Sequence, residues 1–108
     1  MMVFYVYIRL KNTPAASLPA PLRKAVSSNL FESVHLSLSV CGADEIENCI
    51  AAKVKLWKDS GSDLGGAELV VHHIKTSNGG FDLAPATVAA LAEAKLTLCV
   101  THSVLNLK

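Results

Sequence analysis

Four histidines and three cysteines give this chain its main chemical potential, and two of the histidines are adjacent in the segment ELVVHHIKTSNGG. Imidazoles and thiols bind transition metals and act as bases or nucleophiles, so their spacing decides which chemistry is open to them. The segment predicts a strand, in which neighbouring residues point to opposite faces. His72 and His73 therefore cannot bind one metal ion together, and we expect one to face the core and the other to face outward.

The remaining histidines and cysteines do not complete a metal or redox site. A strand site would need His-x-His and a helical site His-x-x-x-His, and neither spacing occurs. Cys41, Cys49 and Cys99 form no Cys-x-x-Cys pair, and an odd number of widely spaced cysteines is not typical of a disulfide framework. We predict no metal, no cofactor and no catalytic residue, and the thiols indicate a reducing cytoplasm.

Two further motifs have structural explanations. GSDLGG, at positions 61–66, is similar to a phosphate-binding loop, but it precedes a predicted strand and lacks the terminal Gly-Lys-Ser/Thr, so we interpret it as a linker. Asp44, Glu45 and Glu47 lie where a predicted helix begins. The helix dipole favours negative charge at that end, so we interpret them as capping residues and not as a carboxylate pair.

The elements that must position these groups follow from hydrophobic periodicity. Residues 2–10, 33–40 and 96–105 alternate between apolar and polar side chains, as strands with one buried face do, and residues 67–75 form a further strand. The alternation predicts that the core contains Phe4, Val6, Ile8, Leu10, Val34, Leu36, Leu38, Val40, Leu96, Leu98 and Val100. Ser33, His35, Ser37 and Ser39 are then predicted to face outward.

Apolar residues three and four positions apart predict three helices, over about 20–30, 43–61 and 83–95. The predicted buried residues are Leu22, Val26 and Leu30 in the first helix, Ile46, Cys49, Ile50, Val54 and Trp57 in the second, and Val88, Leu91 and Ala92 in the third. The element order is β-α-β-α-β-α-β. It predicts an α/β (α+β-like) two-layer sandwich in one domain, residues 1–108, with three helices on one face of a four-stranded mixed sheet.

The stretch LVVHHIKTSNGGFDLAPATVAALAEAKLTLCVT carries a resemblance to a known family. It resembles the closing strand, Gly-aromatic-x-Leu-x-Pro helix and final strand of a family of uncharacterised small bacterial domains of unknown function. The likeness covers roughly residues 68–101 in motif and the rest of the chain in element order. It implies a fold and, because the family has no established activity, it assigns no catalytic residue.

Composition narrows the possible partners. The chain has 108 residues, 51% of them hydrophobic and 18% charged, which is too apolar for a disordered chain and favours self-association. The net charge of +1 is dispersed, so no basic patch for nucleic acid is expected. The opening MMVFYVYIRLK is too short an apolar run to cross a membrane and lacks a basic leader, so we predict neither nucleic-acid nor membrane partners.

The face of the sheet without helices is the predicted site. Alternation places eight candidate residues there: Tyr5, Tyr7, Arg9, His35, Ser37, Thr97, Cys99 and Thr101. Tyrosine and arginine are enriched at recognition surfaces, so we predict a non-enzymatic cytoplasmic interaction module, a homodimer that uses this face or a sheet edge to contact a protein partner. The alternative is a small-molecule-binding protein or minor enzyme that uses the same face through His35, Tyr7, Arg9 and Cys99.

Overall fold

The computed structural model describes residues 2–11, 13–30, 33–60, 66–75 and 81–104. In chain order the elements are β1 (Met2–Lys11), a 3₁₀ turn η1 (Ala15–Ser17), α1 (Ala20–Lys24), β2 (Val26–Leu30), β3 (Ser33–Cys41), α2 (Ile46–Ser60), β4 (Glu68–Lys75), α3 (Pro85–Glu93) and β5 (Thr97–Val104). The predicted linker GSDLGG lies outside the described residues except for Gly66.

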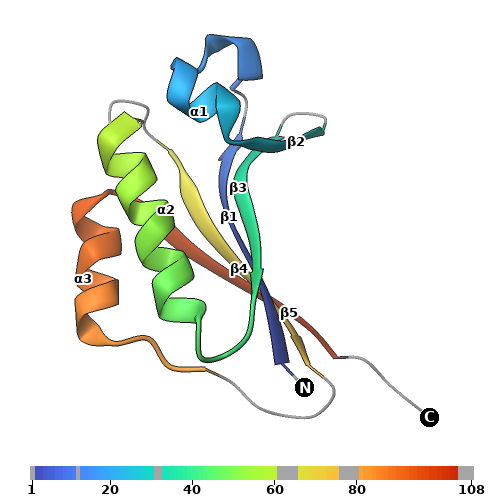
Figure 1. Ribbon diagram of the computed structural model, residues 1–108, viewed down its shortest axis with the longest axis vertical. Helices are drawn as coiled ribbons and strands as arrows, with labels where there is room; N and C mark the ends of the chain where they lie inside the picture. Colours follow the sequence, from blue (N-terminus) through green and yellow to red (C-terminus); the bar gives the residue numbers. More distant parts are fainter. Residues whose placement is uncertain (1, 12, 31–32, 61–65, 76–80, 105–108) are drawn as a thin grey trace.

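The described strands form one mixed sheet in the order β2-β3-β1-β4-β5. Strand β1 lies at its centre and pairs antiparallel with β3 and β4, whereas β4 and β5 are parallel. Helices α2 and α3 pack side by side on the same side of the sheet, and α1 lies at the end formed by β2 and β3 (Figure 1). The predicted mixed α/β fold is confirmed, with five described strands in the sheet and not four.

The strand that the sequence did not predict is β2, which falls inside the helix expected over residues 20–30. Helix α1 ends at Lys24, and the chain then pairs with β3. Valine, serine and asparagine follow this point, and all three form helices poorly because they lose rotamer freedom or bond to the backbone. Leu22 is buried as predicted, and Val26 packs half-buried against the core. The side chain of Leu30 lies outside the described part of the chain.

A β-bulge at Ser37 interrupts the alternation of β3. Strand β1 pairs Ile8 with Leu36 but Val6 with Ser39, so β3 contains one more residue than β1 over this stretch. Ser37 itself has a φ of 54°, in the left-handed region. Because side chains alternate along a strand, one extra residue moves everything that follows it to the opposite face.

The bulge explains where the predicted core of β3 was wrong. Val34 and Leu36, which precede the bulge, are buried against the helices as predicted. Leu38 and Val40 follow it and face away from the helices, with 48% and 61% of their surfaces exposed. The sequence pattern of β3 is regular on both sides of Ser37, so periodicity alone does not reveal the reversal.

The same reversal gives α2 a polar contact inside the helical layer. Ser39, predicted to face outward, instead accepts a hydrogen bond from the buried Lys53 ammonium at 2.7 Å. Burial lowers the pKa of Lys53. Cys41 and Cys49 lie beside it, and burial, together with the hydrogen bond to Cys49, raises the pKa of the Cys41 thiol to about 12. The lysine therefore keeps a partner although it is nearly inaccessible to water.

Two hydrogen bonds from the bulge connect it to the start of β2. The Ser37 N–H donates to the Ala25 carbonyl at 2.7 Å, and the Leu38 N–H donates to Ser27 Oγ, also at 2.7 Å. These bonds give partners to two consecutive N–H groups at the point where the regular pairing of β3 is interrupted. The unpredicted strand and the unpredicted bulge thus stabilise each other.

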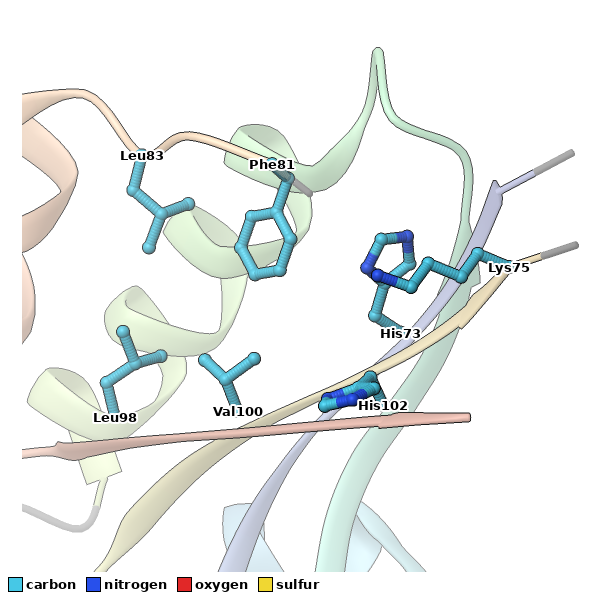
Figure 2. A pocket seen from close by; sticks show the side chains of 7 residues that line it. All are labelled: His73, Lys75, Phe81, Leu83, Leu98, Val100 and His102. Atoms are coloured by element: carbon cyan, nitrogen blue, oxygen red, sulfur yellow. The ribbon is translucent and has the colours of Figure 1, made fainter. Parts of the chain in front are cut away.

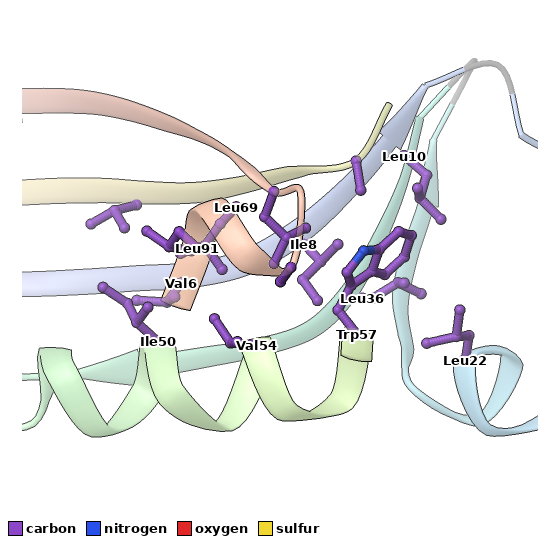
Figure 3. Close-up of a cluster of buried hydrophobic side chains, with 14 of the residues drawn as sticks. Val6, Ile8, Leu10, Leu22, Leu36, Ile50, Val54, Trp57, Leu69 and Leu91 are labelled. Atoms are coloured by element: carbon purple, nitrogen blue, oxygen red, sulfur yellow. The ribbon is translucent and has the colours of Figure 1, made fainter. Parts of the chain in front are cut away.

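The core lies between the sheet and the helices (Figure 3). Helix α2 contributes Ile50, Val54 and Trp57, which face Leu91 of α3 and the inner side of β1. The predicted inner residues of β1 (Phe4, Val6, Ile8 and Leu10) and the predicted Ile46 are all buried, whereas Cys49 is half-buried at the margin. No helix in the described part of the chain is long and apolar enough to span a membrane.

Glu47 joins α3 to α2. Its carboxylate accepts a hydrogen bond from the Ala84 N–H at 2.7 Å and another from the Thr87 hydroxyl. These bonds, the one from Thr87 first, lower the pKa of Glu47. Glu47 does lie in the first turn of α2, where a capping role was expected, but its bonds cap the start of α3 instead.

This connection fixes which side of α3 faces the core. Leu91 is buried as predicted, and Ala94, seven residues after Thr87, is buried with it. Val88 is 51% exposed and Ala92 is also exposed, so both predictions for the buried stripe were wrong. The buried side of α3 is therefore shifted by one residue from the prediction, because Thr87 and not Val88 faces α2.

The left-handed conformation of Ser37 makes the bulge testable. Glycine adopts positive φ without steric cost, so Ser37→Gly should raise the free energy of unfolding by about 1 kcal/mol. Ser37→Val should lower it by about 2 kcal/mol, because a β-branched residue is strained there. Urea unfolding followed by circular dichroism measures both variants. Equal stability of the two variants would contradict a left-handed residue at this position.

Candidate functional site

Seven of the eight predicted site residues, all except Ser37, lie on the face of the sheet opposite α2 and α3, here called the open face. Strand β1 presents Tyr5, Tyr7 and Arg9 on it, and its partners in register share that face. Ser37 is the half-buried bulge residue. From the registers, the described residues of the open face are Val3, Tyr5, Tyr7, Arg9, Lys11, Ser33, His35, Leu38, Val40, Glu68, Val70, His72, Ile74, Thr97, Cys99, Thr101 and Ser103.

A bidentate ion pair lies on the open face between β1 and β4. Arg9 Nε donates to Glu68 Oε1 at 3.3 Å, and Arg9 Nη2 donates to Glu68 Oε2 at 3.2 Å. The Lys11 ammonium lies 3.5 Å from the same carboxylate. The bond from Arg9 lowers the pKa of Glu68, and the pair raises the pKa of Arg9. The sequence prediction missed Glu68 because only the register of β1 with β4 brings it to Arg9.

Cys99 contacts arginine and not histidine. Arg9 Nη2 donates to the Cys99 sulfur at 3.6 Å. His35 lies on β3, and the strand order places β1 and β4 between it and β5. At about 4.8 Å for each strand step, this separates the two strands by roughly 14 Å. The structure therefore does not bring Cys99 and His35 together as a thiol with its base.

His35 packs instead against an aromatic ring. The centroids of the Tyr7 and His35 rings are 4.4 Å apart, with the planes tilted by 31°. Burial, and then the positive charge of Arg9, lower the pKa of the imidazole, so His35 is neutral at pH 7. Tyr7 is also paired with Val70 of β4, whose side chain is buried on this face. The centre of the open face is thus apolar and aromatic.

The two adjacent histidines face opposite sides of the sheet. His72 lies on the open face, where Nδ1 contacts the Thr101 hydroxyl and Nε2 contacts the Ser103 hydroxyl at 3.2 Å. His73 lies on the helix side, in register with Phe4. The structure therefore decides which of the two faces outward.

His73 is enclosed by aromatic rings. It stacks on Phe4, with centroids 4.4 Å apart and planes at 16°, and meets Phe81 edge-on at 5.6 Å. Its side chain is 2% exposed, and its Nε2 atom has no hydrogen-bond partner among the described residues. Burial lowers the pKa of His73, and the charges of Lys75 and His102 add to this. The ring is therefore neutral at pH 7.

A cavity of about 370 Å³ adjoins this ring, here called the helix-side cavity. It is lined by His73, Lys75, Phe81, Leu83, Leu98, Val100 and His102 (Figure 2). Leu98 and Val100 face the helix side as predicted, but they are 38% and 48% exposed because they line this cavity. Leu96, nearer α3, is buried as predicted.

No metal centre is visible in the part of the chain that the structure describes: no three histidine, cysteine or acidic residues come together there. Protein-family models, curated proteins and solved structures give no match to the chain.

His73 should make the protein sensitive to acid. A neutral buried histidine stabilises the fold above its ordinary pKa of 6.5, and this contribution is lost as the pH falls, because the unfolded chain takes up the proton more readily. His73→Phe removes both this dependence and the unpaired nitrogen, and should raise the free energy of unfolding by about 1–2 kcal/mol at pH 8.

The increase in the free energy of unfolding that His73→Phe gives over the wild type should become larger as the pH is lowered from 8 to 5. Urea unfolding measures this difference. His102→Gln is the control, because it removes an exposed histidine from the neighbouring strand. A stability difference between wild type and His73→Phe that stays constant with pH would contradict the neutral, buried state of His73.

Proposed function

We propose that the chain is a non-enzymatic interaction module that forms a homodimer by packing the open faces of two sheets. Exposed apolar residues carry this proposal. Leu38 and Val40 stand on the open face because of the bulge, next to Tyr5 and Tyr7 of β1. We call these four residues the apolar patch. Tyr5 and Tyr7 are half-buried, and exposed aliphatic side chains beside partly exposed tyrosines are typical of surfaces that become buried on association.

The charges of the open face favour a second copy of the same chain over a charged partner. Arg9 and Glu68 neutralise each other within the face, with Lys11 at its margin. Such a surface does not attract a polyanion, because it has no concentrated positive field. A two-fold axis would pair the apolar patch with itself, and the Arg9–Glu68 pair beside the patch would need no new partner.

The dimensions of the sheet support the same proposal. Four of the described strands have eight to ten residues. At about 3.3 Å per residue and about 4.8 Å between strands, the sheet offers a platform of roughly 30 × 20 Å. This is on the order of the 800 Å² that each partner of a stable dimer buries.

The polar groups of the open face give less support to the alternative of a ligand site or enzyme there. Arg9 is engaged by Glu68, and His72 by Thr101 and Ser103. A catalytic or binding group would instead direct unused hydrogen-bonding capacity toward its ligand.

The free thiols of the described cysteines fit the proposed cytoplasmic location, because disulfides form mainly in oxidising compartments.

A charge placed in the apolar patch tests the dimer. Val40→Glu should convert the protein from dimer to monomer at concentrations near 50 μM. The dimer dissociation constant should rise about tenfold or more, because two desolvated carboxylates would face each other across the two-fold axis. The masses are measured by sedimentation equilibrium, and circular dichroism verifies that the variant is folded. Tyr7→Ala should weaken the dimer in the same direction.

Val88→Glu is the matched control, because Val88 is similarly exposed but lies on α3, away from the open face. It should leave the dimer mass unchanged. A monomeric wild type at 50 μM, or equal effects of the two substitutions, would contradict the proposal.

A further inference from the structure

We propose that the helix-side cavity binds a small carboxylate that has an apolar, preferably aromatic, body. This site is on the opposite side of the sheet from the open face, so it does not depend on the proposed dimer. Its volume, about 370 Å³, falls within the range of small-molecule sites in proteins. The cavity has an apolar wall and a polar end, and Figure 2 shows its lining residues on β4, on β5 and on the segment that precedes α3.

The apolar wall consists of Phe81, Leu83, Leu98 and Val100. Leu98 and Val100 belong to β5 and leave much of their surface exposed, although they lie on the face of the sheet that the helices cover elsewhere. Phe81 and Leu83 approach from the segment that precedes α3 (Figure 2). Two opposed apolar surfaces of this kind suit a ring or a short aliphatic chain, which would remove both from water.

The polar end consists of His73, Lys75 and His102. Lys75 carries a positive charge, and the described residues that line the cavity include no acidic side chain. An anionic group bound here would be attracted by the Lys75 ammonium, and a carboxylate accepts hydrogen bonds from ammonium and imidazole N–H groups.

His73 supplies an independent observation. Its Nε2 atom is buried without a hydrogen-bond partner among the described residues. Such an atom destabilises a protein unless another molecule completes its bond. Because His73 stands at the polar end of the cavity, a ligand carboxylate near Lys75 is suited to be that molecule.

A metal ion fits the polar end less well. His73 and His102 are in register on neighbouring parallel strands, which brings two imidazoles to one face. A third histidine, cysteine or acidic ligand is missing from the described residues around them, and the Lys75 ammonium would repel a cation. The charge and the apolar wall together favour an organic anion.

The test is a titration of the full chain, labelled with ¹⁵N, with 3-phenylpropionate, followed by amide chemical shifts. We expect saturable shifts confined to residues 73–75, 81–83 and 98–102. 3-Phenylpropionamide, which has the same body without the charge, should bind about tenfold more weakly. Lys75→Met and His73→Phe should each weaken 3-phenylpropionate binding by about tenfold or more.

Lys55→Met is the control, since Lys55 is an exposed lysine of α2 that does not line this cavity. It removes the same charge and should leave the affinity unchanged. The proposal is overturned by an absence of saturable shifts, by shifts centred elsewhere, by equal binding of acid and amide, or by equal effects of Lys75→Met and Lys55→Met. Zinc or nickel that binds at these residues more tightly than the carboxylate would also overturn it. The Val40→Glu variant should bind the probe as the wild type does, so failure of the dimer and failure of this site are distinguishable.

Discussion

The one-residue bulge at Ser37 determines how the two sides of this sheet differ. Before it, Val34 and Leu36 point toward the helices, and after it Leu38 and Val40 point away from them. Without the extra residue, β3 would bury two more aliphatic side chains and leave the polar face predicted from alternation. Hydrogen bonds to the start of β2 hold the bulge in place. The bulge therefore moves Leu38 and Val40 from the core to the open face, an arrangement more typical of functional surfaces than of defects.

The sheet separates two chemical environments across a single strand. His72 and His73 are adjacent in sequence, yet the first bonds with hydroxyls in water while the second is neutral between two phenyl rings. The open face satisfies its own polar groups and exposes apolar ones. The helix-side cavity also exposes apolar side chains, but they lie beside a buried polar atom, His73 Nε2, that has no hydrogen-bond partner among the described residues. The first pattern suits a flat protein surface, and the second suits a small molecule.

The sequence predicted whichever features depend on local periodicity. The inner face of β1, the core residues of α2 and the placement of the candidate residues on the face without α2 and α3 all follow from spacings of two, three or four residues. Features that depend on pairing were missed. The bulge, the strand β2 and the partner of Arg9 become visible only when the register between distant strands is known. The rotation of α3 likewise depends on Glu47, which lies 40 residues from Thr87 along the chain. A single sequence contains no record of such contacts.

The central position of β1 also constrains how the chain can acquire its structure. Its two neighbours in the sheet are β3 and β4, and β4 ends at Lys75. During synthesis on a ribosome, one edge of β1 must therefore stay unpaired until β4 has been made. The apolar residues of its inner face are not fully buried in that interval. Contacts between such distant segments slow folding, because a long loop must close before they form. The unpaired edge and exposed apolar residues of β1 favour aggregation during that interval, and a chaperone that binds extended apolar segments would find its target there.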